Sequence, residues 1–265
     1  MSTLLHKNNV KITGNGDQAM IFVHGFGCDQ NMWRFVAPSF ENDYKVVLLD
    51  LVGAGGSDAR YYNKQKYDTL TGHAQDIIDL CEFLNLNDII FVGHSVSAMI
   101  GALVDIHQPG LIEKLVMIGP SPCYINDENY HGGFDQKDIE ELLEAMDINY
   151  LGWSSSLAPV IMGNADKPEL GNELKESFCK TDPEIAQEFA KVTFLSDNRA
   201  DLHRIKADCL ILQCQEDIIA PETVGEYLKE KIPSNSYTVL DATGHCPHMS
   251  APEETIAAIT DFLEL

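Results

Sequence analysis

The sequence predicts an α/β fold, a doubly wound and mostly parallel sheet with helices on both faces and an all-helical insertion. Three observations indicate this architecture. Five short runs are apolar throughout rather than at every second residue, as strands buried on both faces require. Helical patterns fall between those runs, which is typical of parallel strands joined by crossovers. One long segment later in the chain contains no strand pattern.

The predicted sheet begins near the N-terminus. The run "NVKIT" precedes the apolar run at residues 19–23, and the intervening Gly-Asn-Gly-Asp predicts an antiparallel hairpin. Ile77, Leu80, Cys81 and Leu84 recur at the spacing of one buried helix face. The other strands are expected at residues 45–50, 88–93, 114–119 and 208–214, with a last strand, "SYTVL", at residues 236–240.

The segment without strands is interpreted as a helical lid over the carboxyl edge of the sheet. Its clearest helix carries one apolar stripe, formed by Ile139, Leu142, Leu143 and Met146. Prolines at positions 159, 168 and 183 are expected to divide the rest into short helices. The predicted lid spans residues 124–200, and the predicted core spans residues 1–123 and 201–265.

The composition limits the classes of function. A chain of 265 residues with 45% apolar residues suits one large domain or a domain with an insertion. The net charge of -23 argues against a nucleic-acid partner and against an anionic membrane surface, because both attract Lys and Arg. No apolar run approaches the roughly 20 residues of a membrane helix, and the start of the chain lacks a signal-peptide pattern.

The cysteines favour a reducing compartment. There are seven, an odd number, and none lies in C-x-x-C spacing. A disulfide framework is therefore not expected, and the pattern fits reduced thiols in a cytoplasmic protein.

The stretch "FVGHSVSAMIG" carries the predicted nucleophile, Ser95. It matches the pattern G-x-S-x-G except that Ser97 replaces the second glycine. An apolar run precedes it and a small-residue helix pattern follows, which is the context that lifts a serine above a sheet. The positions two residues away must be small because strand and helix approach closely there, and serine meets that requirement.

The serine hydroxyl needs a base that takes its proton, and the chain order Ser, Asp, His places that base last. His245 in "GHCPHMS" is the predicted base, while His248 is expected to pack or hydrogen-bond locally. Asp217 in "CQEDIIAP" is the predicted acid that orients His245, with the adjacent Glu216 as the alternative.

The stretch "FVHGFGCD" supplies a predicted oxyanion hole. Gly25 and Gly27 allow the backbone to turn so that the amide of Phe26 faces the site. The amide of Val96, which follows the nucleophile, is the second expected donor.

Two patterns imitate cofactor sites. "HCPH" lacks a second pair of ligands at zinc spacing, and Pro247 interrupts it. "LVGAGGSD" lacks the third glycine of a dinucleotide fingerprint and lies in the second strand–helix unit. We therefore expect neither a metal nor an organic cofactor.

Several motifs together resemble one family. "HGFGCDQ", "GHSVSAMIG", "GPSPCYIND", "YHGGF", "LQCQEDIIAP" and "GHCPHMS" are similar to the bacterial RsbQ-type hydrolases and their plant relatives, the karrikin and strigolactone receptors. The resemblance runs nearly end to end. It implies the α/β-hydrolase fold with a lid of four helices, and the catalytic residues Ser95, Asp217 and His245. The plant branch also has serine where Ser97 stands.

The resemblance also implies an apolar pocket and a class of ligand. Family members hydrolyse small esters or butenolide lactones, often slowly, and the RsbQ type acts upstream of a PAS-domain phosphatase in the sigma-B stress response. Related receptors have an aromatic residue in the second lid helix where this chain has Leu157, so the pocket is expected to be wider here. The other positions that match pocket residues are Phe26, Tyr124, Phe134, Trp153, Phe194 and Ile218.

Two functions from different classes fit these patterns. The first is a serine hydrolase of a small apolar ester or lactone. The second is a ligand-sensing protein with little turnover, in which lid movement signals to a protein partner. A cofactor-free haloperoxidase or carbon–carbon hydrolase would use the same triad and stays open. A haloalkane dehalogenase is set aside, because it needs an aspartate where Ser95 stands.

Overall fold

The computed structural model describes residues 3–264, which contain a seven-stranded sheet of order β1-β3-β2-β4-β5-β6-β7. Every strand pair is parallel except β1 with β3. The predicted fold class is thus confirmed. The strands are β1 (Lys11–Thr13), β2 (Ala19–Val23), β3 (Lys45–Leu49), β4 (Ile89–His94), β5 (Ile112–Ile118), β6 (Asp208–Glu216) and β7 (Asn235–Thr243).

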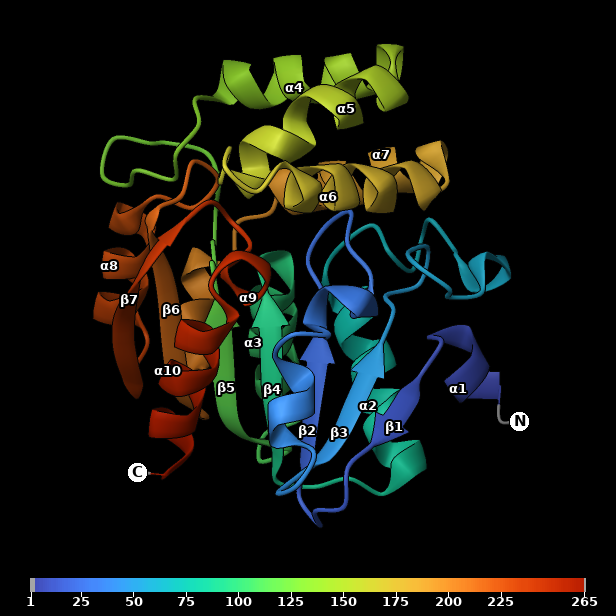
Figure 1. Cartoon of the computed structure of the whole chain (residues 1–265), viewed down its shortest axis with the longest axis vertical. Coiled ribbons are helices and arrows are strands. Elements are labelled where there is room, and N and C mark those ends of the chain that lie inside the picture. The colour runs from blue at the N-terminus through green and yellow to red at the C-terminus, as the bar shows by residue number, and fades with distance from the viewer. Residues whose placement is uncertain (1–2, 265) are drawn as a thin grey trace.

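Helices cover both faces of the sheet (Figure 1). In β2, Ile21 and Val23 pack in a core shared with α2, α3 and α8, while Met20 and Phe22 pack on the other face in a core shared with α10. Burial on both faces explains why this strand is apolar throughout. The helices outside the lid are α1 (Thr3–Lys7), α2 (Thr71–Leu84), α3 (Val96–His107), α8 (Glu222–Lys231), α9 (Pro247–Ser250) and α10 (Pro252–Glu264).

The predicted N-terminal hairpin is wrong. Strand β1 pairs antiparallel with β3 at the edge of the sheet, and β2 lies on the other side of β3. All five residues of β2 are buried between two parallel neighbours, β3 and β4. In the centre of the sheet this apolar strand buries more apolar surface than it would in a hairpin at the edge, and this burial stabilises the fold.

The insertion forms the lid, with α4 and α5 stacked above α6 and α7 at the carboxyl edge of the sheet (Figure 1). Pro168 and Pro183 begin α6 and α7, as expected, but Pro159 lies inside α5. A proline near the end of a helix interrupts few hydrogen bonds, and the Pro159 carbonyl still accepts one from Gly163. The lid helices are α4 (Gln136–Ile148), α5 (Tyr150–Met162), α6 (Pro168–Lys180) and α7 (Pro183–Phe194).

The two segments that join the lid to the core run side by side. Cys123 and Asp197 form a β-bridge, and the Asn198 amide donates to the Pro122 carbonyl at 2.7 Å. Arg199 pairs with both Asp127 and Asp197 across the same joint. The lid therefore leaves and re-enters the core at one place.

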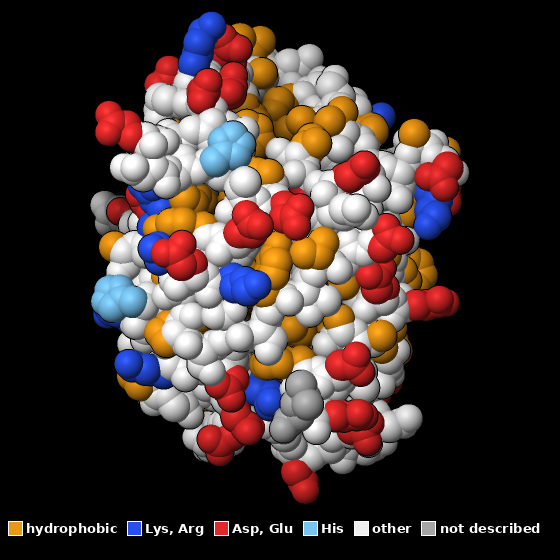
Figure 2. Space-filling model, turned by 90° about the vertical axis from the view of Figure 1, so that its left-hand side faces the viewer, with side chains coloured by type: hydrophobic (Ala, Val, Ile, Leu, Met, Phe, Trp, Pro, Cys, Tyr) orange, Lys and Arg blue, Asp and Glu red, His pale blue; other side chains and the backbone are white. Residues whose placement is uncertain are grey.

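On the face shown in Figure 2, acidic side chains are scattered, and apolar side chains gather among them at the level of the lid. The most exposed large apolar residue of the lid is Ile148, which is 77% exposed. No helix in residues 3–264 combines the length and apolar character needed to cross a bilayer.

Candidate active site

Ser95 stands on a sharp turn between β4 and α3. Its backbone has φ 57° and ψ -125°, a conformation that non-glycine residues rarely adopt. The same strained backbone is typical of a nucleophilic serine on a strand-to-helix turn. The Ser95 amide is held by the Ile118 carbonyl of β5 at 2.8 Å. A Cβ on Gly93 would lie 2.5 Å from the Ser97 carbonyl oxygen, which shows how closely strand and helix approach.

Ser97 has a structural role at the position where the pattern expects glycine. Its side chain is fully buried, and its hydroxyl donates to the His24 carbonyl at 2.5 Å. His24 directly precedes the loop that carries Phe26. The extra hydroxyl thus ties the helix behind the nucleophile to that loop.

Ser95, His245 and Asp217 form one hydrogen-bonded chain. The Ser95 hydroxyl donates to His245 Nε2 at 2.8 Å, and His245 Nδ1 donates to Asp217 Oδ2 at 2.7 Å. Asp217 Oδ1 accepts from the amides of Ile219 and Ala220 at 2.8 and 3.1 Å. With both oxygens engaged and the side chain buried, the carboxylate fixes the tautomer and the orientation of the imidazole.

Glu216 takes no part in this chain. Its side chain is exposed and accepts from the Thr243 hydroxyl at 3.2 Å, away from the imidazole. Of the two adjacent acids, the structure brings only Asp217 to His245.

Gly119, with φ +55°, leaves room for the His245 ring, since a Cβ at this position would lie 3.2 Å from the ring.

The two predicted oxyanion donors come from the loop after β2, which carries Phe26, and from Val96, the residue after the nucleophile. Neither the Phe26 amide nor the Val96 amide donates to another group within residues 3–264, which leaves both available to a ligand oxygen. Gly27 has φ +71° in a turn closed by the Cys28 amide and the Gly25 carbonyl at 3.2 Å. A Cβ on Gly25 would lie 3.1 Å from the Ser95 Cβ, so the loop passes close to the nucleophile.

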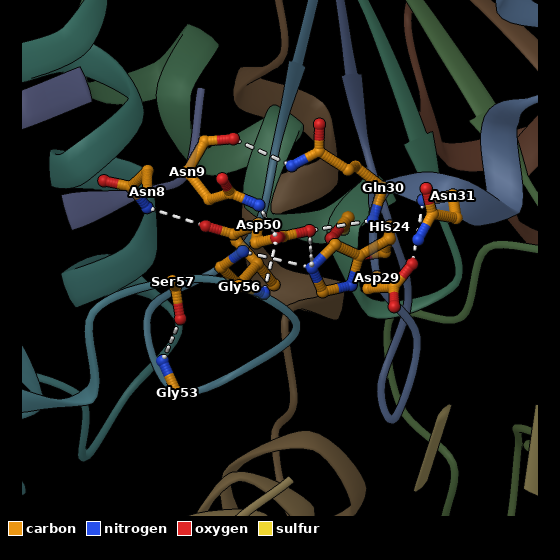
Figure 3. A network of polar contacts seen from close by, with 12 residues as sticks. Asn8, Asn9, His24, Asp29, Gln30, Asn31, Asp50, Gly53, Gly56 and Ser57 are labelled. Carbon is orange, nitrogen blue, oxygen red and sulfur yellow. Dashed lines mark hydrogen bonds and ion pairs between the residues drawn. The ribbon is translucent and has the colours of Figure 1, made fainter. Parts of the chain in front are cut away.

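A polar network around Asp50 holds the residues on both sides of this loop (Figure 3). Asp50 Oδ1 accepts from the Gln30 amide at 2.8 Å, and Oδ2 accepts from Asn9 Nδ2 at 2.7 Å and the Gly56 amide at 2.8 Å. His24 Nε2 accepts from the Leu51 amide at 3.0 Å. The loop that follows β2 is therefore fixed to the loop that follows β3.

Two further histidines pack behind the triad. His94 Nε2 donates to the His245 carbonyl at 2.7 Å and so helps to hold the catalytic loop. His248 is buried against the rings of Trp33 and His94, and neither ring nitrogen has a partner within residues 3–264. Burial lowers the pKa of His94 well below its usual value and that of His248 to about 3, so both are neutral at pH 7. His248 packs locally, as expected.

A small cavity of about 30 Å³ lies over Ser95, between the sheet edge and the lid. Such a volume holds about two water molecules. The Tyr124 hydroxyl reaches to 3.5 Å from the Ser95 hydroxyl, and burial raises the pKa of Tyr124 to about 12, which keeps it a neutral donor. The lining is mostly apolar, as expected, but the space is much narrower than a deep pocket.

The structure places three of the seven predicted pocket residues on the cavity wall: Phe26, Tyr124 and Phe194. The other four lie elsewhere. Trp153 packs behind the wall, edge-on to Phe26 at 6.3 Å between ring centroids, and together with Leu157 it lines a shallow groove on the outside of the lid.

Phe134 packs at the edge of the lid core and does not reach the cavity. Ile218 is 53% exposed, and its neighbour Ile219 lines the cavity instead. The Asp217 carboxylate caps the amide of Ile219, and this turn directs Ile218 to solvent. Leu157 does not border the cavity and therefore does not widen it.

Sequence reasoning missed several wall residues from the lid. Ile161, Leu174 and Phe178 come from α5 and α6, and their only sequence signal is an apolar position in a helix. Cys28 and Cys246 also line the cavity, and burial raises the pKa of Cys28 to about 12 and that of Cys246 well above its usual value. Both therefore remain protonated thiols and do not compete with Ser95 as nucleophiles.

A larger open groove of about 580 Å³ lies away from the triad, between α2, α3 and α7. Its wall contains no triad residue, so the smaller cavity is the candidate site. Among the described residues, no group of three or more His, Cys, Asp or Glu side chains is placed to hold a metal.

Comparisons with known proteins agree with this geometry. Residues 20–258 match the model of the alpha/beta hydrolase family. The chain is 38% identical over 260 residues to the karrikin insensitive 2 receptor CA of Petunia hybrida, covering 98% of this chain and 96% of that protein. It is 40% identical over 251 residues to the strigolactone esterase RMS3 of Pisum sativum, covering 94% of each.

Among solved structures, a hydrolase from Oleispira antarctica superposes with a TM-score of 0.96 at 41% identity, over 99% of this chain and 96% of that one. Family model, relatives and structural neighbour each span nearly the whole chain. This protein therefore belongs to the alpha/beta hydrolase family, as a serine hydrolase related to the plant strigolactone esterases and karrikin receptors.

Proposed function

We propose that the protein hydrolyses small apolar esters or butenolide-type lactones, with Ser95 as nucleophile, His245 as base and Asp217 as orienting acid. The hydrogen-bonded chain from Ser95 to Asp217 at the floor of an apolar cavity carries this proposal. The relatives named for karrikin and strigolactone support the ligand class.

The acylation step follows from these contacts. Ser95 Oγ bonds to the carbonyl carbon while its proton passes to His245 Nε2, 2.8 Å away. Asp217 stabilises the imidazolium that forms. The negative charge on the carbonyl oxygen is met by the amides of Phe26 and Val96, which have no other acceptor in the described chain.

The intermediate then collapses, and His245 gives its proton to the leaving oxygen. In an ester the alcohol departs, whereas in a lactone the new hydroxyl stays attached to the acyl chain. Water attacks the acyl-serine with His245 again as the base, which restores the Ser95 hydroxyl and releases the acid. The side chains described supply every proton transfer.

The test is turnover of p-nitrophenyl acetate by wild type and Ser95→Ala, side by side. Serine-dependent hydrolysis supports the proposal, and loss of most activity in Ser95→Ala is expected. Full activity in Ser95→Ala would move the nucleophile elsewhere. If neither protein reacts, the same pair is compared on an unsubstituted butenolide, and failure there too contradicts the proposed chemistry.

A second candidate, a ligand sensor with slow turnover, is favoured by the size of the cavity. About 30 Å³ cannot hold even a small ester, so a ligand must displace the lid side chains above Ser95. The lid is also bonded to the catalytic loop, because the Ile161 carbonyl of α5 accepts from the His245 amide at 2.9 Å. Asn164 adds a bond to the Thr243 carbonyl at 2.7 Å. Displacement of the lid would thus strain or break the bond to the His245 amide.

We propose the RsbQ-type role as the form of this second candidate, with a PAS-domain phosphatase as the partner that responds to lid movement. The motifs "GPSPCYIND" and "GHCPHMS" support it by resemblance. Hydrogen exchange of α5, α6 and the turn between them is compared with and without the unsubstituted butenolide, in Ser95→Ala to prevent turnover. Faster exchange at residues 161–167 with ligand supports a sensor, and unchanged exchange contradicts it.

A further inference from the structure

Thr193 carries an unused hydroxyl at the cavity wall. It lies near the end of α7, beside Phe194, and both residues line the cavity over Ser95. The side chain is 1% exposed, and its Oγ1 has no hydrogen-bond partner within residues 3–264. The hydroxyl takes no part in the bonds that join Ser95, His245 and Asp217.

This arrangement is unusual for a helical threonine. A threonine in a helix commonly turns its hydroxyl to the carbonyl three or four residues earlier, which satisfies it locally. Thr193 makes no such bond. A buried hydroxyl without a partner destabilises the fold, whereas a valine of nearly the same shape would not. The group is therefore available to whatever fills the cavity.

Three other polar side chains on the cavity wall contact one another at the nucleophile. Ser95 and His245 bond to each other, and Tyr124 has its hydroxyl next to Ser95. The unpaired Nδ1 of His94 lies directly beneath Gly25, where a Cβ would approach it to 2.5 Å. Thr193, on the lid helix α7, thus adds a hydrogen-bonding group from the lid, whereas the predicted oxyanion donors belong to the core.

We propose that the Thr193 hydroxyl donates a hydrogen bond to a second oxygen of the bound ester or lactone, an ether or carbonyl oxygen separate from the carbonyl that Ser95 attacks. This proposal rests on the proposed function, because it takes the cavity as the place where the acyl group binds. It selects substrates whose acyl or ring part carries an additional acceptor atom.

The chemistry of the cavity favours an acceptor oxygen over a charged or donor group. The wall is mostly apolar, so a polar ligand atom placed against it loses hydration when it binds. An ether or ester oxygen loses little hydration, and one donated bond satisfies it. The net charge of -23 also disfavours an anionic ligand group.

The experiment uses pairs of p-nitrophenyl esters that differ only in one oxygen. Methoxyacetate is compared with butyrate, and 3-methoxypropionate with valerate, so that an ether oxygen replaces a CH₂ at two chain positions. The ratio of kcat/KM within each pair is measured for wild type, Thr193→Val and Thr193→Ser. Comparing ratios between proteins cancels the intrinsic reactivity of each ester.

Thr193→Val is expected to lower the ratio for at least one pair by about 5-fold, the effect of one neutral hydrogen bond. Thr193→Ser keeps the hydroxyl and is expected to stay within about twofold of wild type. The proposal is overturned if Thr193→Val leaves both ratios unchanged, as it would if the hydroxyl only held a structural water. It is also overturned if Thr193→Ser lowers them equally, because shape would then be the cause.

Binding separates this proposal from the proposed function. In the Ser95→Ala background, dissociation constants of methyl methoxyacetate and methyl butyrate are measured by ligand-observed NMR, with and without Thr193→Val. The same shift in ratio is expected without any turnover. If hydrolysis proves independent of Ser95 but this shift is present, the proposed function fails and the role of Thr193 stands. If the shift is absent while Ser95-dependent hydrolysis persists, only the role of Thr193 fails.

Discussion

The sheet edge and the lid build the two halves of the site by different means. At the sheet edge, directed hydrogen bonds hold each functional group, as in the bonds from the amides of Ile219 and Ala220 to Asp217. In the lid, aromatic and aliphatic packing dominates, with Phe178 in contact with the rings of Phe26 and Trp153. Hydrogen bonds fix positions, whereas packing fixes volume and tolerates rearrangement.

Because of this difference, we expect the sheet edge to control the catalytic rate and the lid to control which substrates bind. The triad is fully formed although the cavity above it holds only about two water molecules. Changes at the sheet edge should therefore alter the rate on every substrate. Changes in the lid should alter which substrates enter and how stable the lid is.

The largest expected effect separates two adjacent acids at the sheet edge. Asp217→Asn should lower kcat/KM by roughly 10³- to 10⁴-fold, because the neutral amide favours the wrong tautomer of His245. Glu216→Gln should leave the rate within about twofold, since in residues 3–264 the Glu216 side chain bonds only to the Thr243 hydroxyl. Esterase kinetics of the two variants test this, and the reverse order of effects would assign the acid to Glu216.

The next effect tests whether the lid is a packed core. Phe178→Ala should lower the free energy of unfolding by about 3–5 kcal/mol, because the ring is buried and its removal leaves a cavity. It should also raise the activity on long acyl chains relative to acetate.

Ile148→Ala is the matched control in the lid, since Ile148 is 77% exposed and should change stability by less than about 0.5 kcal/mol. Urea unfolding and a chain-length series of esters measure both variants. Equal stability of Phe178→Ala and Ile148→Ala would show that the lid is held by something other than this packing.

A pH effect arises where core and lid meet. His73 is buried between the rings of Tyr67 and Phe189, and burial lowers the pKa of His73 to about 4. Between pH 6.5 and 4 the unfolded chain binds a proton at this residue that the folded chain does not. As the pH is lowered through this range, this group therefore decreases the free energy of unfolding by about 1.4 kcal/mol per pH unit.

His73→Phe removes that contribution and keeps an aromatic ring in place. The variant should lose stability less steeply than wild type between pH 6.5 and 4.5, by about 1.4 kcal/mol per pH unit. Urea unfolding at pH 7.5, 6.0 and 4.5 measures both slopes. Parallel slopes would mean that His73 is not held neutral in the folded state.

The smallest effect compares two buried serines. Ser97→Ala should lower kcat/KM by about 5-fold, because it frees the loop that carries Phe26, and Ser97→Gly should behave alike. Ser154 is also buried and donates to a carbonyl, that of Tyr150 at 2.8 Å, but it lies in the lid. Ser154→Ala should alter stability and leave kcat/KM on acetate within about twofold. Equal kinetic losses would show that the two regions are not independent.

Sequence patterns predicted the sheet edge far better than the lid, for a physical reason. Ser95, Asp217 and His245 each follow a strand, and strand ends in a parallel sheet meet at one edge. Local chain chemistry thus placed them. The N-terminal hairpin failed because β2 gains more from two buried neighbours than from a nearby turn.

The cavity wall depended on features that no local pattern encodes. Whether Ile218 or Ile219 faces inward is decided by the cap that Asp217 forms on the Ile219 amide. Leu157 packs at the groove between α4 and α5 rather than at the cavity, because of how α5 packs on α6 and α4. Thr193 carried no signal, since a threonine in an amphipathic helix is ordinary until its missing partner is seen.

The central claim is that His245 and Asp217, at the edge of the sheet, activate Ser95 as a nucleophile. Covalent labelling tests this claim most directly. Wild type, Ser95→Ala and Asp217→Asn are treated with a short-chain alkyl fluorophosphonate, and intact mass and peptide mapping locate the adduct. The account predicts one adduct per chain on Ser95, none in Ser95→Ala and much slower labelling in Asp217→Asn. An adduct at another residue, or equal labelling of all three proteins, would contradict it.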